Sequence, residues 1–556
     1  MSRSRSWLLA LALYTVVSLA YAWPLVSRFV THLAGDGFDM YVFQWDNWWI
    51  THALCTGQNP YHTRMIFYPV GVALYFHSFS WLNTGVWWLL RGLVGDVAAY
   101  NFTVWWSWPL AGLGGYFLAR EIADDRRAAL VAGLIYAFYP YHFAQRNHLN
   151  LLSIQWVPFS LLFWIRATRR GRLRDGTLAG VFFALSGLAG WHLLTLSGML
   201  AGLWLLYGWL TERRRWAGGN WRAVLAMVLV LAVLTGPLLA PIGWEWFVNP
   251  QGQDPYLGKE GETQTDLVAY FLPNLYHPLW GHLAAPIHGR FLRNKDHSVA
   301  LGYLPLLLVL YGLARWRKVK EGRFWLIGLA CFLILALGPF PRVNGVAYPQ
   351  VPLPYRLIGW TPVVRSLRVP ERFNILVGLC LAMVGGVAAK DLLHRLPWGL
   401  RGRVALILGT LILLEYWAWP FPTTPSDVPA FYHRLAAEPG DFAILEVPMG
   451  NDLSKLYMFY QTVHGRPTVT GHVSRRPEAA YAFIRVHQTL RSLWDERRPP
   501  SDRRLTADVD SFAGVGIRYI VVHRDRMGPG EWVAWVTYAN IPPLVEEGDL
   551  VVYCLK

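Results

Sequence analysis

The chain has 556 residues, of which 54% are apolar and only 15% are charged, and its formal net charge is +16. Because a soluble protein normally has about a quarter of its residues charged, this composition excludes a disordered chain and disfavours an ordinary soluble enzyme. Four cysteines are too few for a disulfide-rich scaffold. Recurring apolar runs instead indicate a membrane protein, in which a positive charge can record topology rather than an acidic partner.

Eleven apolar runs are candidates for membrane-spanning helices, which need roughly 17–25 residues, or fewer inside a large bundle. In chain order they lie at 7–26, 97–119, 128–142, 151–167, 177–191, 193–210, 222–240, 299–314, 323–338, 373–390 and 404–420. The first run also fits a secretory signal peptide, because Ala20-Tyr21-Ala22 resembles a cleavage site. The ten later runs favour an uncleaved anchor.

The stretch 71–93 is also apolar, but counting it as a span would reverse the side of every later loop. Without it, the loops on one side hold 23 Lys and Arg against 7 Asp and Glu, and the charges of all other residues sum to zero. The positive-inside rule then places the N-terminus in the cytoplasm. We therefore expect 71–93 to lie in the outer interface, where Trp81, Trp87 and Trp88 are well suited.

The sequence changes character near residue 420. Residues 1–420 are expected to form an all-α polytopic membrane bundle with long outer loops at 27–96, 241–298 and 339–372. After Phe421 come a Pro-Thr-Thr-Pro-Ser linker and then short β-branched runs among helical stretches, and these runs are 442–448, 517–523 and 550–555. This pattern predicts a C-terminal extracytoplasmic α/β domain over 421–556.

Near its start, the first outer loop has two closely spaced carboxylates, Asp36 and Asp39, beside glycines. Two carboxylates three residues apart can converge on one point, which suits a general base or a pair of oxygen ligands for Mg²⁺, Mn²⁺ or Ca²⁺. The same spacing is typical of a solvated turn that caps the next helix, with Asp39 near the helix N-terminus. On spacing alone, the turn is the better interpretation.

Other polar groups in the outer loops are candidates for substrate binding. His52 follows a cluster of tryptophans, which is typical of an interfacial belt and also fits a sugar-stacking platform. Arg146 and His148 stand among Gln and Asn in the second outer turn. Polar groups between apolar spans face the bundle interior or a water-filled cavity, so these residues form either interhelical hydrogen bonds or a polar site.

The Pro-rich loop 339–372 holds five arginines and a single acid, Glu371. An anionic ligand such as a lipid phosphate would explain so many arginines on the outer side, and we expect Arg368 and Arg372 to bind it. The alternative is simple anchoring to lipid headgroups. Elsewhere, Cys55 and Cys554 are both expected outside, but only their sidedness suggests a disulfide.

This layout resembles the GT-C class of integral-membrane glycosyltransferases, which includes protein mannosyltransferases and aminoarabinose transferases. The shared features are an acidic first outer loop with amphipathic helices, an arginine in the second outer turn and a soluble domain at the end. The first-loop pattern Gly-Asp-Gly-x-Asp is similar to that of uncharacterised bacterial multi-spanning proteins. The chain departs from the class because it has no Asp-Glu pair of the mannosyltransferase type and because no acid follows Arg146 in its turn.

The resemblance implies that Asp36 acts as base or metal ligand with Asp39 second, that Arg146 contacts substrate, and that Arg368 and Arg372 contact phosphate. It implies transfer of a sugar from a polyprenyl-phosphate carrier to a glycan, lipid or protein acceptor at the outer face of the inner (plasma) membrane. No nucleic-acid partner is expected.

Two other classes of function remain open. One is a transporter or flippase of a lipid-linked substrate, which the scarcity of charged residues in the spans disfavours. The other is a non-catalytic scaffold whose outer domain binds glycan. Convergence of Asp36, Arg146 and Arg368 on one cavity would favour the enzyme, whereas their separation would favour the scaffold.

Overall fold

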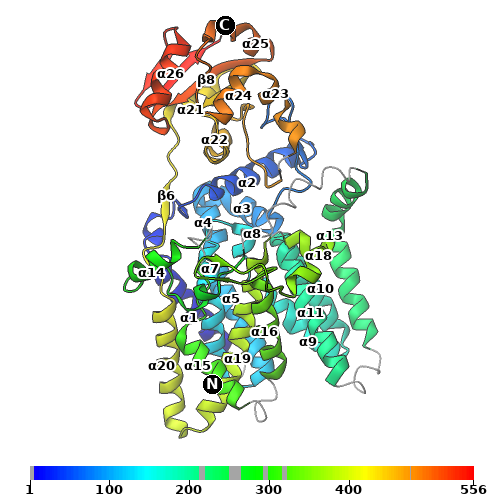
Figure 1. The fold of residues 1–556 in the computed structure, drawn as a ribbon. Helices are drawn as coiled ribbons and strands as arrows, with labels where there is room; N and C mark the ends of the chain where they lie inside the picture. Colours follow the sequence, from blue (N-terminus) through cyan, green and yellow to red (C-terminus); the bar gives the residue numbers. More distant parts are fainter. Residues whose placement is uncertain are drawn as a thin grey trace. The chain divides into compact units, whose positions relative to one another are not determined.

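The computed structural model describes residues 6–211, 220–248, 264–291, 298–315, 322–367, 369–475 and 477–555. The chain divides into two compact units (Figure 1). The first unit comprises residues 1–36, 80–240 and 256–424, and the second comprises residues 37–79, 241–255 and 425–556.

The first unit is built mainly from helices. Its longer helices are α1 (Ser6–Tyr21), α3 (Trp81–Val94), α4 (Asp96–Trp105), α5 (Ser107–Ala123), α6 (Arg126–Phe138), α9 (Trp156–Arg170), α10 (Leu173–Ala189), α11 (Trp191–Thr211), α13 (Trp221–Val248, whose last residues belong to the second unit), α15 (Tyr303–Ala314), α16 (Arg323–Ala336), α19 (Asn374–His394) and α20 (Trp398–Tyr416). Each of the eleven expected runs overlaps at least one of these helices. Short elements connect them, among them α14 (Gly281–His288), the hairpin of β4 (Arg342–Val343) and β5 (Val346–Ala347), α17 (Tyr355–Ile358) and α18 (Pro362–Leu367).

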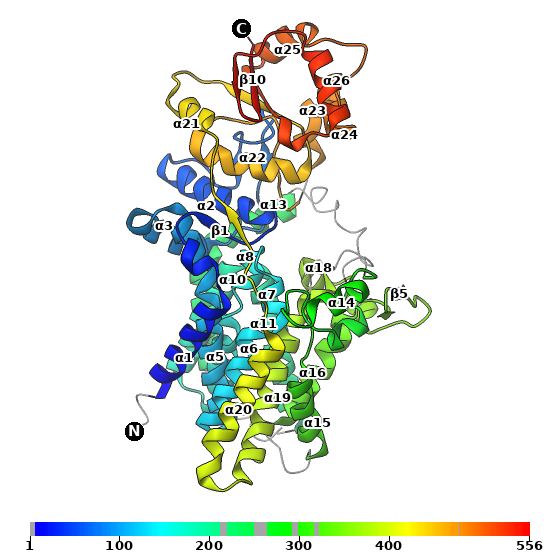
Figure 2. The same ribbon diagram turned by 90° about the vertical axis from the view of Figure 1, so that its left-hand side faces the viewer.

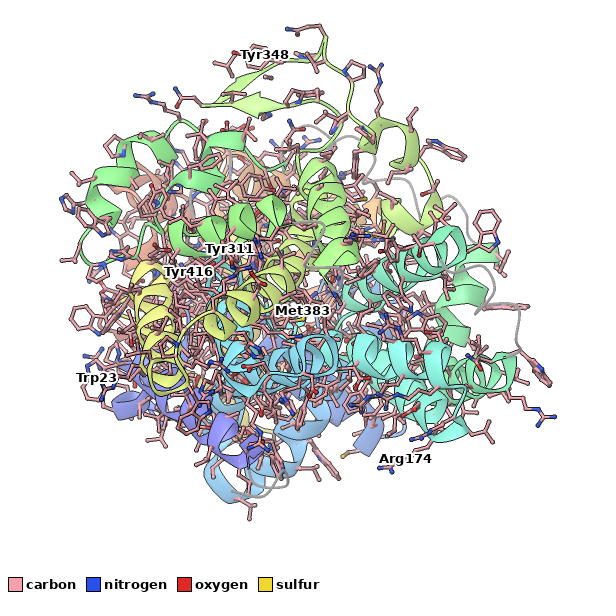
Figure 3. The ribbon with its side chains drawn as sticks, turned by 90° about the horizontal axis from the view of Figure 1, so that it is seen from below. Trp23, Arg174, Tyr311, Tyr348, Met383 and Tyr416 are labelled. Carbon is pink, nitrogen blue, oxygen red and sulfur yellow. The ribbon has the colours of Figure 1, made fainter. Side chains whose placement is uncertain are left out.

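Helix α19 forms the core of the first unit. It packs against α5, α6, α15, α16 and α20, and seen from below Met383 lies among these helices whereas Arg174 and Tyr348 lie at the rim (Figure 3). Glycines permit this close packing, because a Cβ at Gly378 would come within 2.6 Å of the Tyr139 ring and one at Gly386 within 2.9 Å of Ala132. Small residues at helix interfaces are the common means of tight packing in membranes.

Four helices in the described residues are long and apolar enough to cross a bilayer on their own: Leu149–Arg170, Trp191–Thr211, Trp221–Glu245 and Pro370–His394. Three further apolar helices are shorter: Ser6–Tyr21, Tyr303–Ala314 and Arg323–Ala336. The apolar character of the predicted spans is therefore clear in these seven helices.

Two of the expected helices have different boundaries. The run 97–119 is divided between α4 and α5, because Pro109 has no N–H to donate to the carbonyl four residues earlier. The run 71–93 is helical only from Trp81, since Val72–Ala73 pairs with His62–Thr63 as strands β3 and β2. The 14 residues of α3 extend about 21 Å, which is shorter than the hydrocarbon core.

The basic loops meet at one end of the first unit. Arg166 and Arg170 both bind Glu121, His394 binds Asp125 (3.1 Å), and the Asn220 side chain donates to the Thr168 carbonyl (2.5 Å). The opposite ends of the helices are joined by hydrogen bonds from tyrosine hydroxyls to backbone carbonyls. There the Tyr21 hydroxyl donates to the carbonyl of Tyr416 (2.9 Å) and the Tyr139 hydroxyl to that of Val299 (2.9 Å).

The second unit is an α/β structure around a four-stranded sheet of order β7-β8-β10-β9. Its strands are β7 (Ala443–Val447), β8 (Ile517–His523), β10 (Leu550–Cys554) and β9 (Val545–Glu547). β7 and β8 are parallel with Leu445 opposite Ile520, whereas β8, β10 and β9 pair antiparallel. Every residue of β7 and all of β8 except Arg518 are buried, as expected for parallel strands that are covered on both faces.

Helices surround this sheet: α21 (Ala430–Ala437), α22 (Asn451–His464), α23 (Ala482–Val486), α24 (Gln488–Asp495), α25 (Val509–Gly514) and α26 (Pro529–Ala539). Cys554 at the end of β10 is a free thiol, and so is Cys55, so the suggested disulfide is absent among the described residues.

Residues 37–79 group with the C-terminal segment, although we expected the whole of 27–96 to belong to the N-terminal domain. The reason is that α2 (Asp39–Cys55) packs against α22. Gln461 of α22 lies at the centre of this packing, since it accepts a hydrogen bond from the Trp45 indole (2.7 Å) and donates one to the Met65 carbonyl (2.6 Å).

Candidate functional site

Asp36 directly follows a segment that is tightly held within the first unit. Strand β1 (His32–Ala34) pairs with β6 (Thr423–Pro425), and the Asn101 side chain accepts a hydrogen bond from the Ala34 N–H (2.8 Å). Gly35 has a φ of +118°, which other residues rarely adopt. The glycine therefore turns the chain out of the strand and presents Asp36 at a fixed position.

Arg146 lies in the turn between two short helices, α7 (Pro140–Ala144) and α8 (Leu149–Leu152). Only 1% of its side chain is exposed. The guanidinium carbon lies 4.4 Å from the centre of the Tyr276 ring and 5.1 Å from that of Phe143. Contact with two aromatic rings thus fixes the orientation of this buried guanidinium group.

Asp36 and Arg146 form a bidentate ion pair. The Arg146 Nη2 donates to both carboxylate oxygens of Asp36 (2.8 and 2.9 Å), and Nε donates to Oδ1 (3.1 Å). The Tyr276 hydroxyl donates to Oδ2 (2.7 Å), and the Asn147 amide donates to Oδ1 (3.0 Å). We call these four residues the Asp36–Arg146 site.

The charge state of Asp36 follows from these contacts. Burial alone would raise the pKa of its carboxyl group, but the charge of Arg146 and the hydrogen bonds from Arg146, Tyr276 and Asn147 lower the pKa below its ordinary value. Asp36 is therefore ionised at neutral pH. A carboxylate held in this way is a weak proton acceptor, so it suits orienting a hydroxyl or stabilising positive charge better than removing a proton.

The remaining candidate residues of the first unit lie in its loops. His148 closes the turn after Arg146, through a hydrogen bond from its N–H to the Gln145 carbonyl (2.8 Å). Arg372 lies in the 3₁₀ turn Pro370–Phe373 and donates from Nη1 to the Leu367 carbonyl (2.6 Å). Arg368 lies outside the described residues.

Asp39 and His52 belong to the second unit. Asp39 begins α2 and binds the Lys455 ammonium group (2.6 Å), which also binds Asp452 (2.9 Å). Burial lowers the pKa of Lys455, but the two carboxylates outweigh it and raise the pKa above its usual value. His52 stacks on Trp48 with ring centres 5.3 Å apart, so that its ring packs within the tryptophan cluster.

The two carboxylates of the first loop do not fit the expected divalent-cation site. Each is neutralised by a basic side chain, Arg146 for Asp36 and Lys455 for Asp39. Across the described ranges, no three His, Cys, Asp or Glu side chains lie together as a metal site would require.

Tyr276 and Asn147 are the members of the site that sequence reasoning missed. Tyr276 lies 240 residues from Asp36 in the chain. The one local signal is the sequence Pro273-Asn274, because the Asn274 side chain accepts a hydrogen bond from the Tyr276 N–H (2.9 Å) and so forms an Asx turn. This turn fixes the tyrosine, but it does not reveal what the tyrosine contacts.

Residues 60–417 match a family described as a domain of unknown function, DUF6311. The chain belongs to this family. No curated protein matches this chain.

Two solved structures share its fold across nearly the whole chain. The oligosaccharyltransferase of Archaeoglobus fulgidus, solved in a complex with Zn and sulfate, is 16% identical, with 96% of this chain and 70% of that chain covered and a TM-score of 0.51. The mycobacterial arabinofuranosyltransferase AftD is 18% identical, with 100% of this chain and 42% of that chain covered and a TM-score of 0.52.

These structural neighbours are GT-C proteins, so the resemblance inferred from the sequence is confirmed at the level of fold. Together with the apolar helices, the fold shows that this DUF6311 member is a membrane protein. At such low identity the likeness establishes the fold alone.

Proposed function

We propose that the protein is a membrane glycosyltransferase that moves a sugar from a polyprenyl-phosphate carrier to an acceptor hydroxyl group. The observation that supports this function best is the Asp36–Arg146 site, an ionised carboxylate held by a buried arginine in a GT-C fold. The two solved neighbours are both glycosyltransferases by name.

In the proposed reaction, the acceptor oxygen forms a bond to the anomeric carbon of the sugar while the bond from that carbon to the carrier phosphate breaks, and the proton of the acceptor hydroxyl leaves with the phosphate. Positive charge develops on the sugar ring in the transition state of such reactions. About a third of the Asp36 side chain is exposed (36%), whereas Arg146 is covered. Asp36 is thus the reachable group, and its negative charge would orient the acceptor hydroxyl and stabilise the developing positive charge.

Arginines of the loop 339–372 complete the proposed site. By resemblance to GT-C enzymes, we assign the carrier phosphate to Arg372 and to Arg368. A guanidinium group binds phosphate through two parallel hydrogen bonds, which suits it to hold the leaving group.

The proposed orientation places the Asp36–Arg146 site at the outer face of the inner membrane and the N-terminus in the cytoplasm. Two observations support this orientation. Arg166, Arg170 and the other basic loop residues lie at one end of the first unit, and the hydrogen bond between Tyr21 and Tyr416 joins helices at the other end. A cytoplasmic basic end follows the positive-inside rule.

The test is Asp36→Asn in a transfer assay with a polyprenyl-phosphate-linked sugar as donor. Asn keeps the size and much of the hydrogen bonding but removes the negative charge, so we expect transfer to fall by at least about 100-fold. Folding of the full chain is checked by its thermal unfolding in detergent. The matched control is Asp124→Asn, which breaks an exposed ion pair with Arg120.

A second variant keeps the test decisive if Asp36→Asn fails to fold. Tyr276→Phe retains the ring over Arg146 and removes only the hydroxyl that donates to Asp36. We expect a smaller fall, of about tenfold, because two hydrogen bonds to charged groups are lost: the one donated to Asp36 and the one accepted from Arg146 Nη2 (2.5 Å). Full activity of a folded Asp36→Asn protein would contradict the proposed function of this site.

A further inference from the structure

A polar cleft in the second unit has no part in the site described above. Its volume is about 580 Å³, and it is lined by α24, by residues of the loop 496–504 and by α26. The two helices are labelled in Figure 2. Pockets that bind small molecules measure about 300–1,000 Å³. The cleft is therefore large enough for a small ligand or for a few units of a polymer.

The loop that forms one wall of the cleft is anchored by two arginines. Arg497 binds Glu531 in the first turn of α26 (3.0 Å), and Arg503 binds Asp508 (3.2 Å), whose side chain is only 1% exposed. Because this wall is held within the unit, little ordering is required when a ligand binds, and pre-organisation of this kind favours affinity.

The floor of the cleft is fixed as well. Tyr538 of α26 lines the cleft, and its hydroxyl donates to Asp508 Oδ2 (2.6 Å). Thr489 of α24 donates to the same oxygen (2.5 Å). One buried carboxylate thus ties α24 and α26 together beneath the cleft and keeps the tyrosine ring in place.

Positive and negative side chains line the cleft in equal numbers, so their charges cancel. The six charged residues that line it are Arg491, Arg498, Arg504, Asp495, Glu496 and Asp502. Among the residues that the structure describes, no two of these six pair with each other, although their neighbours Arg497 and Arg503 are paired. Arg504 already donates from Nη1 to the backbone carbonyls of Ser501 (3.5 Å) and Arg503 (3.0 Å). Within the described part of the chain, the other two guanidinium groups and the three carboxylates are therefore the charged groups available to a ligand.

This lining selects against charged ligands. An anion would meet three carboxylates and a cation three guanidinium groups. In the described ranges no cluster of acids has the composition of a cation site. The cleft is bounded by helices and a loop rather than by a strand edge, so it offers no backbone ladder to an extended peptide.

A neutral polyhydroxylated ligand fits all of these features. Each hydroxyl group both donates and accepts a hydrogen bond, so neighbouring hydroxyls can bind a carboxylate and a guanidinium group at once. We propose that the cleft binds a neutral oligosaccharide, which is the acceptor of the transfer reaction. The acceptor role rests on the proposed function, whereas binding of the glycan to the cleft does not.

The experiment measures binding of the full chain in detergent to an array of neutral and acidic oligosaccharides and to a peptide of mixed charge. The best neutral oligosaccharide is then titrated by calorimetry. We expect neutral glycans to bind and the double variant Arg491→Ala/Asp495→Ala to weaken binding at least about tenfold, because it removes two charged partners of the ligand. The matched control, Glu478→Ala/Arg485→Ala, removes an exposed ion pair outside the cleft and is expected to bind normally.

The outcomes separate the two proposals. Binding of acidic glycans alone, binding of the peptide alone, or unchanged affinity in the cleft variant would each overturn the inference. Glycan binding by a protein that transfers no sugar would remove the acceptor role together with the proposed function and leave the cleft assignment intact. Unchanged transfer by the cleft variant to the glycan that binds would contradict the acceptor role while the proposed function stands.

Discussion

Asp36 and Asp39 stand three residues apart in the sequence, but the fold gives them different partners in different units. Asp36 belongs to the first unit and is held by the planar guanidinium group of Arg146, which itself packs against two aromatic rings. Asp39 belongs to the second unit and shares the ammonium group of Lys455 with Asp452.

This difference is our reason for proposing different roles for the two carboxylates. A bidentate guanidinium fixes both the position and the orientation of a carboxylate, whereas an ammonium group on a flexible chain acts as a point charge. Asp39 also lies at the N-terminus of α2, where an acidic side chain stabilises the helix. We therefore assign a structural role to the Asp39–Lys455 pair and a functional one to the Asp36–Arg146 site.

The largest expected difference between the two sites appears when the basic partner of each carboxylate is removed. Arg146→Met and Lys455→Met both replace a basic side chain with an unbranched apolar one. We expect Arg146→Met to lower transfer by at least about 100-fold, because Asp36 loses the group that orients it. Lys455→Met is expected to leave the transfer rate near that of the natural protein. Lys455→Met is instead expected to lower the free energy of unfolding, and by only about 1 kcal/mol, because Asp39 and Asp452 are partly exposed and water can hydrate them.

The measurement is the transfer rate of each variant, together with its thermal unfolding in detergent. Arg146→Lys separates charge from geometry, since it keeps the charge and loses the fork that binds both oxygens. We expect it to remain strongly impaired. Equal losses of transfer in Arg146→Met and Lys455→Met would show that the two pairs do not differ in role.

The dependence of stability on pH sharpens the comparison, with Asp46 as a contrast. Asp46 is buried on α2 and accepts a hydrogen bond from His77 (2.8 Å). Burial raises the pKa of Asp46, and His77 offsets only part of this increase. The pKa of Asp36 is lowered instead. The two carboxylates should therefore contribute to stability in opposite pH ranges.

The sign follows from proton binding. The stabilisation from Asp36 is present above the pKa of the unfolded chain, about 3.9, and is lost as the pH falls through the lower folded value. The stabilisation from Asp46 is present below about pH 3.9, and it is lost as the pH rises through the higher pKa that Asp46 has in the folded protein. Melting temperatures measured from pH 3 to 7 should show the deficit of Asp36→Asn shrinking toward acid and that of Asp46→Asn shrinking toward neutral pH. Parallel profiles would refute the assignment of opposite shifts.

The sequence was sufficient to predict the helices and two members of the site, because both depend on local signals. An apolar run is visible without its partners, and Asp36 and Arg146 were conspicuous as charged residues beside spans. The contacts that complete the site join residues far apart in the chain, since Asp36 lies 110 residues from Arg146 and 240 from Tyr276. No periodicity records such pairings. The union of residues 37–79 with α22 was missed for the same reason, because the decisive bond between Trp45 and Gln461 spans 416 residues.

The smallest expected effect tests the carboxylate that the GT-C resemblance placed second. Asp39→Asn removes one of the two carboxylate charges that bind the Lys455 ammonium group, but the new side chain can still accept a hydrogen bond. Asp452 remains to neutralise the ammonium group. We expect the transfer rate to change by less than about twofold, and stability to fall by a few tenths to 1 kcal/mol, as for a partly exposed ion pair. A fall in transfer comparable to that of Asp36→Asn, in a protein with an unchanged melting temperature, would place Asp39 in the reaction. The two carboxylates would then have to act together despite their separate partners, and the structural role assigned to the Lys455 pair would be wrong.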